Sequence, residues 1–302
     1  MNSQKTVAAP LSFSGIGLHT GTHAHLRITP APPDTGIVFL RTDLDNFRIE
    51  ACFKNVAKVS YATTLMKQGV WISTVEHLLS PLYALGIDNV FIEIDNLEVP
   101  ILDGSSLPFV EKILAAGIKK QARRRRYLAI RKAVHIRHHE KHISIRPADH
   151  FQVQYSIDFP HPLIHKQSRG FEPAAENFAR EISPARTFGF IQEVEELRKN
   201  GLIRGGSLEN ALVLTPDGLL NGPLRFSDEF VRHKILDCLG DVSLIGYPIL
   251  GRIVASRTGH AMHTELVAKI IADKASWKLV ELEEPRSHSC PCKAEALSAP
   301  AS

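Results

Sequence analysis

The 302-residue chain contains few cysteines and no long apolar run. Its four cysteines are Cys52, Cys238, Cys290 and Cys292. Their spacing is unlike that of a disulfide-rich fold, which indicates a reducing compartment and predicts a cytoplasmic protein. Charged residues and prolines interrupt the apolar segments, so we expect no membrane-spanning helix. The N-terminal sequence MNSQKTVAAPLSFSG has no long apolar core and predicts no signal peptide.

The composition is that of a soluble globular protein, with 44% apolar and 23% charged residues. A net charge of +4 suits an anionic small molecule as well as a nucleic acid. The basic run at 119–126 contains no interleaved aromatic residues, which a single-strand binder would need. We therefore interpret this run as a solvated linker and expect no nucleic-acid partner.

The length favours two domains of ordinary size. Periodicity and turn residues predict helices at 73–86, 106–118, 190–199, 227–245 and 263–273. Short strands separate these helices, and the two halves have a similar order of elements, which hints at a duplication. We place the domains at 1–122 and 127–278, and we expect 279–302 to be a disordered tail.

One predicted helix contains the sequence RFSDEFVRHKILDCLGD at 225–241. Helical spacing places His233, Asp237 and Asp241 in one column, opposite an apolar stripe. The column fits either two ligands of a metal site or a solvent-facing polar surface, and spacing alone favours the surface. A metal site would need a further ligand and an open coordination position.

The first half offers a further ligand in TVEHLL, where Glu76 precedes His77. If His77 bound a metal, Glu76 would lie beside the bound water, where a general base is needed. Two histidines and one aspartate suit a zinc ion that activates water. Taken alone, the motif also fits an exposed Glu–His pair.

Other histidines carry weaker signals. The cluster HIRHHEKH at 135–142 does not match a zinc-binding H-E-x-x-H helix, and it reads as two strands joined by a turn. His19 lies near the tip of the glycine-rich loop SGIGLHTG. His260 follows a glycine in RTGHAMH, where a turn would project its side chain into a site.

Eight motifs occur together in a family-like order: GIGLHTG, TVEHLL, GIDNVFIEI, LDGSSLPFV, ARTFGF, RGGSLENALV, LRFSDEFVRHKILDCLGD and RTGHA. From about residue 5 to about residue 275 the chain resembles the zinc-dependent UDP-3-O-acyl-N-acetylglucosamine deacetylases of lipid A biosynthesis. The resemblance implies an α+β fold of two topologically similar domains. Helices would be sandwiched between two β-sheets, each domain would carry an insert, and the site would lie at the domain junction.

The resemblance also implies a role for each motif residue. The zinc ligands would be His77, His233 and Asp237, although iron(II) also suits such ligands. The catalytic residues would be Glu76 as general base, His260 as cationic partner and acid, Thr187 and Lys234 near the oxyanion, and Asp241 behind His260. The substrate contacts would be His19, Phe188 and Phe159, the last stacking on the uracil ring.

The implied reaction is hydrolysis of the N-acetyl group of UDP-3-O-acyl-N-acetylglucosamine, giving acetate and UDP-3-O-acyl-glucosamine. We expect a monomeric enzyme of the Gram-negative cytoplasm, without an integral membrane segment. Either His260 or protonated Glu76 would protonate the leaving amine. Apolar residues in 187–206 offer a channel for the acyl chain. The competing hypotheses are a zinc amidase with another substrate and a binding module that has lost the chemistry, although no expected catalytic residue is missing.

Overall fold

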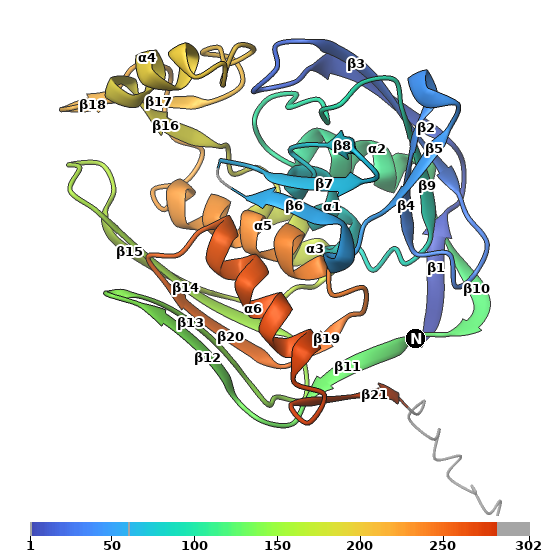
Figure 1. Ribbon diagram of the computed structural model, residues 1–302. Helices are drawn as coiled ribbons and strands as arrows, with labels where there is room; N and C mark the ends of the chain where they lie inside the picture. The colour runs from blue at the N-terminus through green and yellow to red at the C-terminus, as the bar shows by residue number, and fades with distance from the viewer. Residues whose placement is uncertain (1, 60, 283–302) are drawn as a thin grey trace, which may run out of the picture.

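Two five-stranded mixed sheets form the outer layers of the computed structural model, which describes residues 2–59 and 61–282 (Figure 1). The first sheet has the order β2 (Leu11–Ile16), β3 (His23–Pro30), β9 (Val90–Ile94), β4 (Ile37–Arg41) and β5 (Phe47–Glu50). The second has the order β12 (Val134–His138), β13 (Lys141–Arg146), β20 (Arg252–Ser256), β14 (Gln152–Phe159) and β15 (His165–Phe171).

The two sheets have the same topology. In each, the third strand in spatial order comes last in the chain and pairs antiparallel on one side and parallel on the other. Antiparallel hairpins complete both edges. The α+β fold with two topologically similar halves is therefore confirmed.

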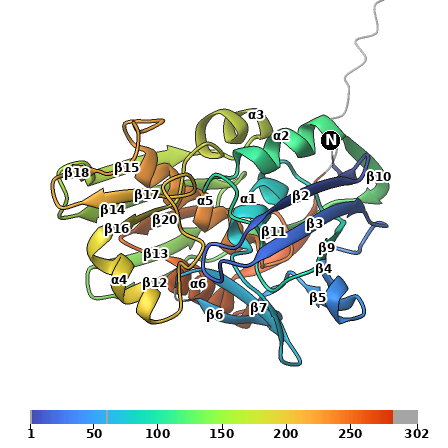
Figure 2. The ribbon, with the colours of Figure 1, turned by 90° about the horizontal axis from the view of Figure 1, so that it is seen from above.

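Helices fill the space between the sheets (Figures 1 and 2). They are α1 (Glu76–Ala84) and α2 (Leu107–Ala116) from the first half, and α5 (Glu229–Ser243) and α6 (His260–Ala272) from the second. Pro81 lies inside α1 without ending it. In the described part of the chain, no helix is long and apolar enough to cross a membrane.

Each half carries an insert before its central helix. The first consists of β6 (Val56–Val59), β7 (Thr63–Lys67) and β8 (Val70–Ile72). The second consists of β16 (Phe188–Phe190), α4 (Ile191–Lys199), β17 (Leu212–Thr215) and β18 (Gly218–Leu219). Short helical turns complete the connections: η1 (Thr42–Leu44), η2 (Phe53–Asn55), α3 (Ala175–Asn177) and η3 (Phe178–Ile182).

Two small sheets correct two of the predictions. The basic run is not a linker, because β10 (Ile118–Arg124) pairs with β1 (Ser3–Val7), and Arg125 forms a 2.7 Å ion pair with Asp88. The start of the expected tail is also ordered, because β21 (Trp277–Glu281) pairs with β11 (Arg126–Ile130). The short strand β19 (Ile249–Leu250) lies on the other side of β11. The rest of the expected tail, from residue 283, lies outside the described residues.

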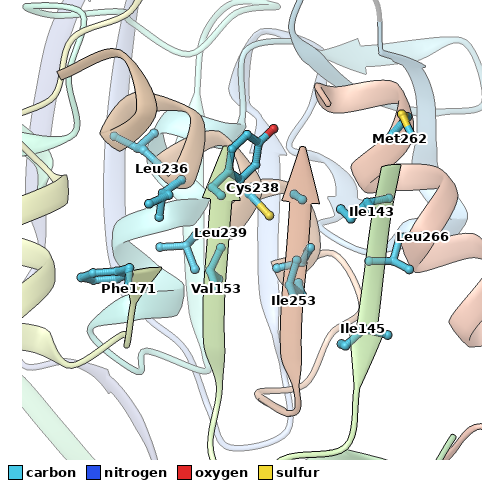
Figure 3. Close-up of a cluster of buried hydrophobic side chains, with 14 of the residues drawn as sticks. Ile143, Ile145, Val153, Phe171, Leu236, Cys238, Leu239, Ile253, Met262 and Leu266 are labelled. Atoms are coloured by element: carbon cyan, nitrogen blue, oxygen red, sulfur yellow. The ribbon is translucent and has the colours of Figure 1, made fainter. Parts of the chain in front are cut away.

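The core of the second half lies between its sheet and helices α5 and α6 (Figure 3). Ile143, Val153 and Ile253 project from three neighbouring strands toward the helices. Cys238 and Leu239 meet them from α5, and both are fully buried. The apolar stripe predicted for this helix is therefore confirmed. Because burial of apolar area dominates folding, this layer fixes the position of α5 on its sheet.

The polar face of α5 meets α1, and Gly240 makes this crossing close. A Cβ atom at Gly240 would lie 2.4 Å from the carbonyl oxygen of Glu76 and 2.8 Å from its Cα. Real Cβ atoms do not approach backbone so closely, so only glycine allows the two helices to cross at this distance. The crossing brings the two halves of the chain together at Glu76 and Asp241.

We expect Gly240→Ala to destabilise the protein although alanine favours helices by about 1 kcal/mol. The added methyl group meets main-chain atoms, and overpacking of this kind costs about 1–3 kcal/mol. Thermal unfolding should therefore show a lower Tm. Gly218→Ala is the matched control, because its Cβ would have no neighbour closer than 3.9 Å. An unchanged Tm for Gly240→Ala would contradict the close crossing.

Candidate active site

Three potential metal ligands from both halves converge where α1 crosses α5. His77 comes from α1, and His233 and Asp237 come from α5. One donor atom of each lies within 4.8 Å of the others, and all three residues are buried. The solvent-facing interpretation of both motifs is therefore wrong. The polar face of α5 is buried because it faces α1 instead of water.

The protonation of these groups fits a metal ion. Burial lowers the pKa of His77 to about 3 and also lowers the pKa of His233, so both imidazoles are neutral, the form that binds metals. His233 Nδ1 donates to the carbonyl of Ala185 at 3.1 Å, which leaves the lone pair on Nε2, 3.4 Å from Asp237. His77 Nδ1 is buried and has no hydrogen-bond partner among the described residues.

Lys234 keeps Asp237 ionised. Its Nζ lies 2.6 Å from Asp237 Oδ2. Burial opposes the charged carboxylate, but neighbouring charges, the Lys234 ammonium first among them, hold the pKa of Asp237 well below its usual value. A buried donor set of two neutral imidazoles and one carboxylate therefore fits a divalent cation such as zinc.

Glu76 is buried beside this set, at the N-terminus of α1. Burial raises the pKa of its carboxyl group to about 8. The backbone N–H of Thr63, on β7, donates to Glu76 Oε2 at 3.0 Å, while Oε1 lies 3.8 Å from His260 Nε2. The carboxyl group is therefore oriented by one insert and directed toward His260.

His260 begins α6 and has Asp241 behind it. Its Nδ1 lies 2.8 Å from Asp241 Oδ2, so Nδ1 donates and Nε2 faces the pocket. Burial opposes the cation, but Asp241 and then Asp237 outweigh burial and raise the pKa of His260 to about 9. Burial would also raise the pKa of Asp241, but His260 lowers that pKa to about 2. The pair is therefore a carboxylate and an imidazolium.

These groups line one pocket of about 300 Å³ at the junction of the halves. The sequence-predicted residues in its wall are His19, Glu76, His77, Phe159, Thr187, Phe188, His233, Lys234, Asp237 and His260. Asp241 is the remaining predicted residue, and it lies behind the wall, fully buried. Phe159 contacts Phe188 and Phe190, with ring centroids 6.0 and 5.8 Å apart, so one side of the pocket is aromatic.

The structure adds three residues that the sequence reasoning missed. The Thr63 hydroxyl donates to Asp241 Oδ1 at 2.5 Å. Glu98 is buried and accepts the backbone N–H groups of His19 and Thr20, which fixes the glycine-rich loop. Glu229 is buried and accepts both the backbone and the side chain of Arg186, next to Thr187. None lies in a spacing pattern that would have singled it out.

The other histidine cluster lies away from the pocket in the part of the chain that the structure describes. It lies on the hairpin of β12 and β13, as the sequence predicts. His138 is exposed and pairs with Glu265 at 2.8 Å, and the described residues of this hairpin form no metal-ligand group. Cys290 and Cys292 lie outside the described residues.

The site contains two buried histidines and a carboxylate that open to a pocket, with a second carboxylate and an imidazolium beside them. This arrangement defines the class of metal-dependent hydrolases. Residues 4–272 match the family described as UDP-3-O-acyl N-acetylglycosamine deacetylase, and the chain belongs to this family. Membership agrees with the donor set, because it implies a metal-dependent enzyme.

Relatives match along nearly the whole chain. A UDP-3-O-acyl-N-acetylglucosamine deacetylase of Solibacter usitatus is 50% identical over 94% of this chain and 96% of its own length. The protein of the same name from Myxococcus xanthus is 48% identical over 92% of this chain and 89% of its own length. A third, from Thermodesulfovibrio yellowstonii, is 48% identical over 90% of this chain and 92% of its own length.

We expect Thr63→Val to destabilise the protein more than Thr64→Val does. The first removes a hydrogen bond to the charged Asp241, worth about 1.5–3 kcal/mol. The second removes a bond between the hydroxyls of Thr64 and Ser73, worth about 0.5–1.5 kcal/mol. Equilibrium denaturation of both variants measures the difference. Equal losses would mean that the Thr63 hydroxyl does not stabilise the Asp241 carboxylate.

Proposed function

We propose that this chain hydrolyses the N-acetyl group of UDP-3-O-acyl-N-acetylglucosamine, giving acetate and the free 2-amine of the UDP-sugar in lipid A biosynthesis. The observation that carries the proposal is the buried set of His77, His233 and Asp237 beside Glu76 and His260, in a chain of the deacetylase family. An amide is a poor electrophile and water is a poor nucleophile, so the reaction needs both a Lewis acid and a base.

His77, His233 and Asp237 are the residues that would hold the metal, which we propose to be zinc. Bound zinc lowers the pKa of water to about 7 and polarises a carbonyl group. Iron(II) is the alternative ion for such ligands. Lys234 balances the carboxylate of Asp237, so the three ligands keep the protonation states that metal binding requires.

Glu76 takes the proton of the attacking water in this proposal. The Thr63 N–H holds one carboxylate oxygen, which leaves the other for the water. A neighbouring divalent cation favours the ionised form of Glu76 and offsets the effect of burial on its pKa. Thr187 lines the same pocket and donates to the oxyanion of the tetrahedral intermediate.

His260 protonates the leaving amine. Its Nδ1–H is committed to Asp241, so the proton on Nε2 is the one that faces the pocket. Because Asp241 stabilises the imidazolium, His260 holds this proton until the amine develops charge. Protonated Glu76 is the alternative donor, 3.8 Å from His260.

The remaining pocket residues position the substrate. We propose that Phe188 packs near the sugar, that Phe159 stacks on the uracil ring, and that His19 borders the substrate on the side of the first half. The second insert supplies the apolar path for the acyl chain, beginning at Phe190 and Ile191, whose side chains are not buried.

We further propose that residues 1–122 and 127–278 act as two domains of a monomer. The first domain contributes one ligand and the second contributes two, so a single copy of the chain completes the site. Because the proposed substrate is a UDP-linked precursor in lipid A biosynthesis, we also propose that the enzyme acts in the cytoplasm of a Gram-negative cell, without a nucleic-acid partner.

Acetate release tests the function. The purified protein should release acetate from UDP-3-O-acyl-N-acetylglucosamine, and a chelator should abolish this release until zinc is added back. Iron(II) added back without oxygen compares the two metals. If folded, metal-loaded protein released no acetate from substrates of several acyl lengths, the proposed substrate would be wrong.

Substitutions of the neighbouring residues Glu76 and His77 test the general base and a metal ligand separately. Glu76→Ala should keep bound zinc but lower kcat at least about 100-fold, because it removes the base. His77→Ala should lower the zinc content, because two ligands hold the ion more weakly than three. Metal analysis and initial rates measure both effects, and the exposed His138→Ala is the control. Wild-type turnover by Glu76→Ala would refute the role of Glu76.

A further inference from the structure

Asp241 binds two imidazoles, and the proposed mechanism uses only one of them. His260 Nδ1 and His263 Nδ1 both lie 2.8 Å from Asp241 Oδ2. His263 is one helical turn after His260 on α6 and is fully buried. It does not line the pocket, so it cannot touch the substrate.

The hydrogen bonds fix which nitrogen of His263 carries a proton. An ionised carboxylate only accepts hydrogen bonds, so Nδ1 of His263 must be the donor. The same holds for Nδ1 of His260. Asp241, His260 and His263 are close enough for a metal site, but with both Nδ1 atoms protonated neither has a lone pair for an ion there.

The other edge of His263 is anchored on β14. Tyr155 is fully buried, and its hydroxyl oxygen lies 2.9 Å from His263 Nε2. The hydroxyls of Tyr155 and Thr258 lie 2.8 Å apart, and Thr258 is 3.3 Å from the same nitrogen. The imidazole is therefore held from both edges, and its Nδ1–H is directed at the carboxylate.

We propose that His263 is a positioning residue for the acid His260. This role rests on the proposed function and adds a residue to its mechanism. The Thr63 hydroxyl donates to Oδ1 of Asp241 and the His263 N–H donates to Oδ2. Together these two hydrogen bonds fix the plane of the Asp241 carboxylate. That plane fixes the His260 ring with Nδ1 protonated and Nε2 toward the pocket. Without His263, the carboxylate rotates about its Cβ–Cγ bond and the His260 ring loses its fixed direction.

The groups around His260 do not replace this restraint. Glu76 and Asp237 each lie 3.8 Å from Nε2, on the pocket side, beyond hydrogen-bond distance. The Thr63 hydroxyl lies 3.4 Å from Nδ1 and is already committed to Asp241 at 2.5 Å. Asp241 is therefore the one close partner of the His260 ring among the described residues.

Two substitutions with amide side chains test whether His263 acts through its hydrogen bond to Asp241 or only through packing. In His263→Asn, the amide nitrogen occupies the place of Nδ1 and still donates to Asp241. In His263→Gln, the amide reaches the place of Nε2 and Tyr155 instead. The zinc-loaded variants are compared by steady-state acetate release, zinc content, and the ring ¹⁵N chemical shifts of His260. The shifts are recorded above the pKa of about 9, where the ring is neutral and they report its tautomer.

We expect His263→Gln to lower kcat about 10- to 100-fold at unchanged KM and zinc content, as for other residues that orient a catalytic group. Above the pKa of His260, where the ring is neutral, its spectrum should show a mixture of tautomers. His263→Asn should retain most of the turnover and a single Nδ1-protonated state. Equal losses in both variants, or an unchanged kcat in His263→Gln, would overturn the proposal.

If His263→Gln does not fold, Tyr155→Phe replaces it. This variant removes the closer partner of Nε2 and leaves Asp241, His263 and the more distant Thr258 hydroxyl in place, so kcat should fall about 10-fold. An unchanged kcat would again count against the proposal. The ¹⁵N spectra do not depend on turnover. A wild type without acetate release would therefore refute the proposed function while the spectra still tested the placement of His260.

Discussion

The close crossing of α1 and α5 is the contact on which the site depends. Gly240 allows the backbone of α5 to meet that of Glu76, and the side chains on either side of this contact are the ligands and the acid–base residues. Neither helix holds three ligands alone. A wider crossing would separate His77 from Asp237 by more than one metal ion can span, so packing geometry here directly determines metal binding.

Burying so many charges at one crossing requires that each has a partner. Burial of an unpaired carboxylate is very costly, and such a group would be protonated instead. Asp237 has Lys234, and Asp241 has His260, His263 and the Thr63 hydroxyl. Among the described residues Glu76 has one close donor, the Thr63 N–H, and its pKa is the one that burial raises. The least compensated carboxylate is thus the one assigned to accept a proton.

Local sequence patterns were enough to predict each helix of the site, but not that two of these helices cross. The spacing of His233 and Asp237 and the sequence around His77 identified the chemistry, and the resemblance joined them. The residues alone favoured exposed surfaces, because a helical wheel cannot tell whether a polar face meets water or another polar helix. The basic run looked like a linker for the same reason, since pairing of β10 with β1 joins strands over 100 residues apart. Thr63 and Glu229 act through tertiary contacts alone, so no local signal marks them.

The repeated topology of the two halves explains where the site lies. In both halves one helix precedes the central strand, and these equivalent helices are α1 and α5. Each insert occupies the same place in its half, between the last edge strand and that helix, so both inserts emerge beside the crossing. The first supplies Thr63 and the second supplies Phe188. Equivalent elements of the two halves therefore carry different chemistry: α1 offers a base and one ligand, whereas α5 offers two ligands and the partner of the acid. Because the equivalent helices pack against each other with different facing side chains, the site is asymmetric although the frame around it is nearly symmetric.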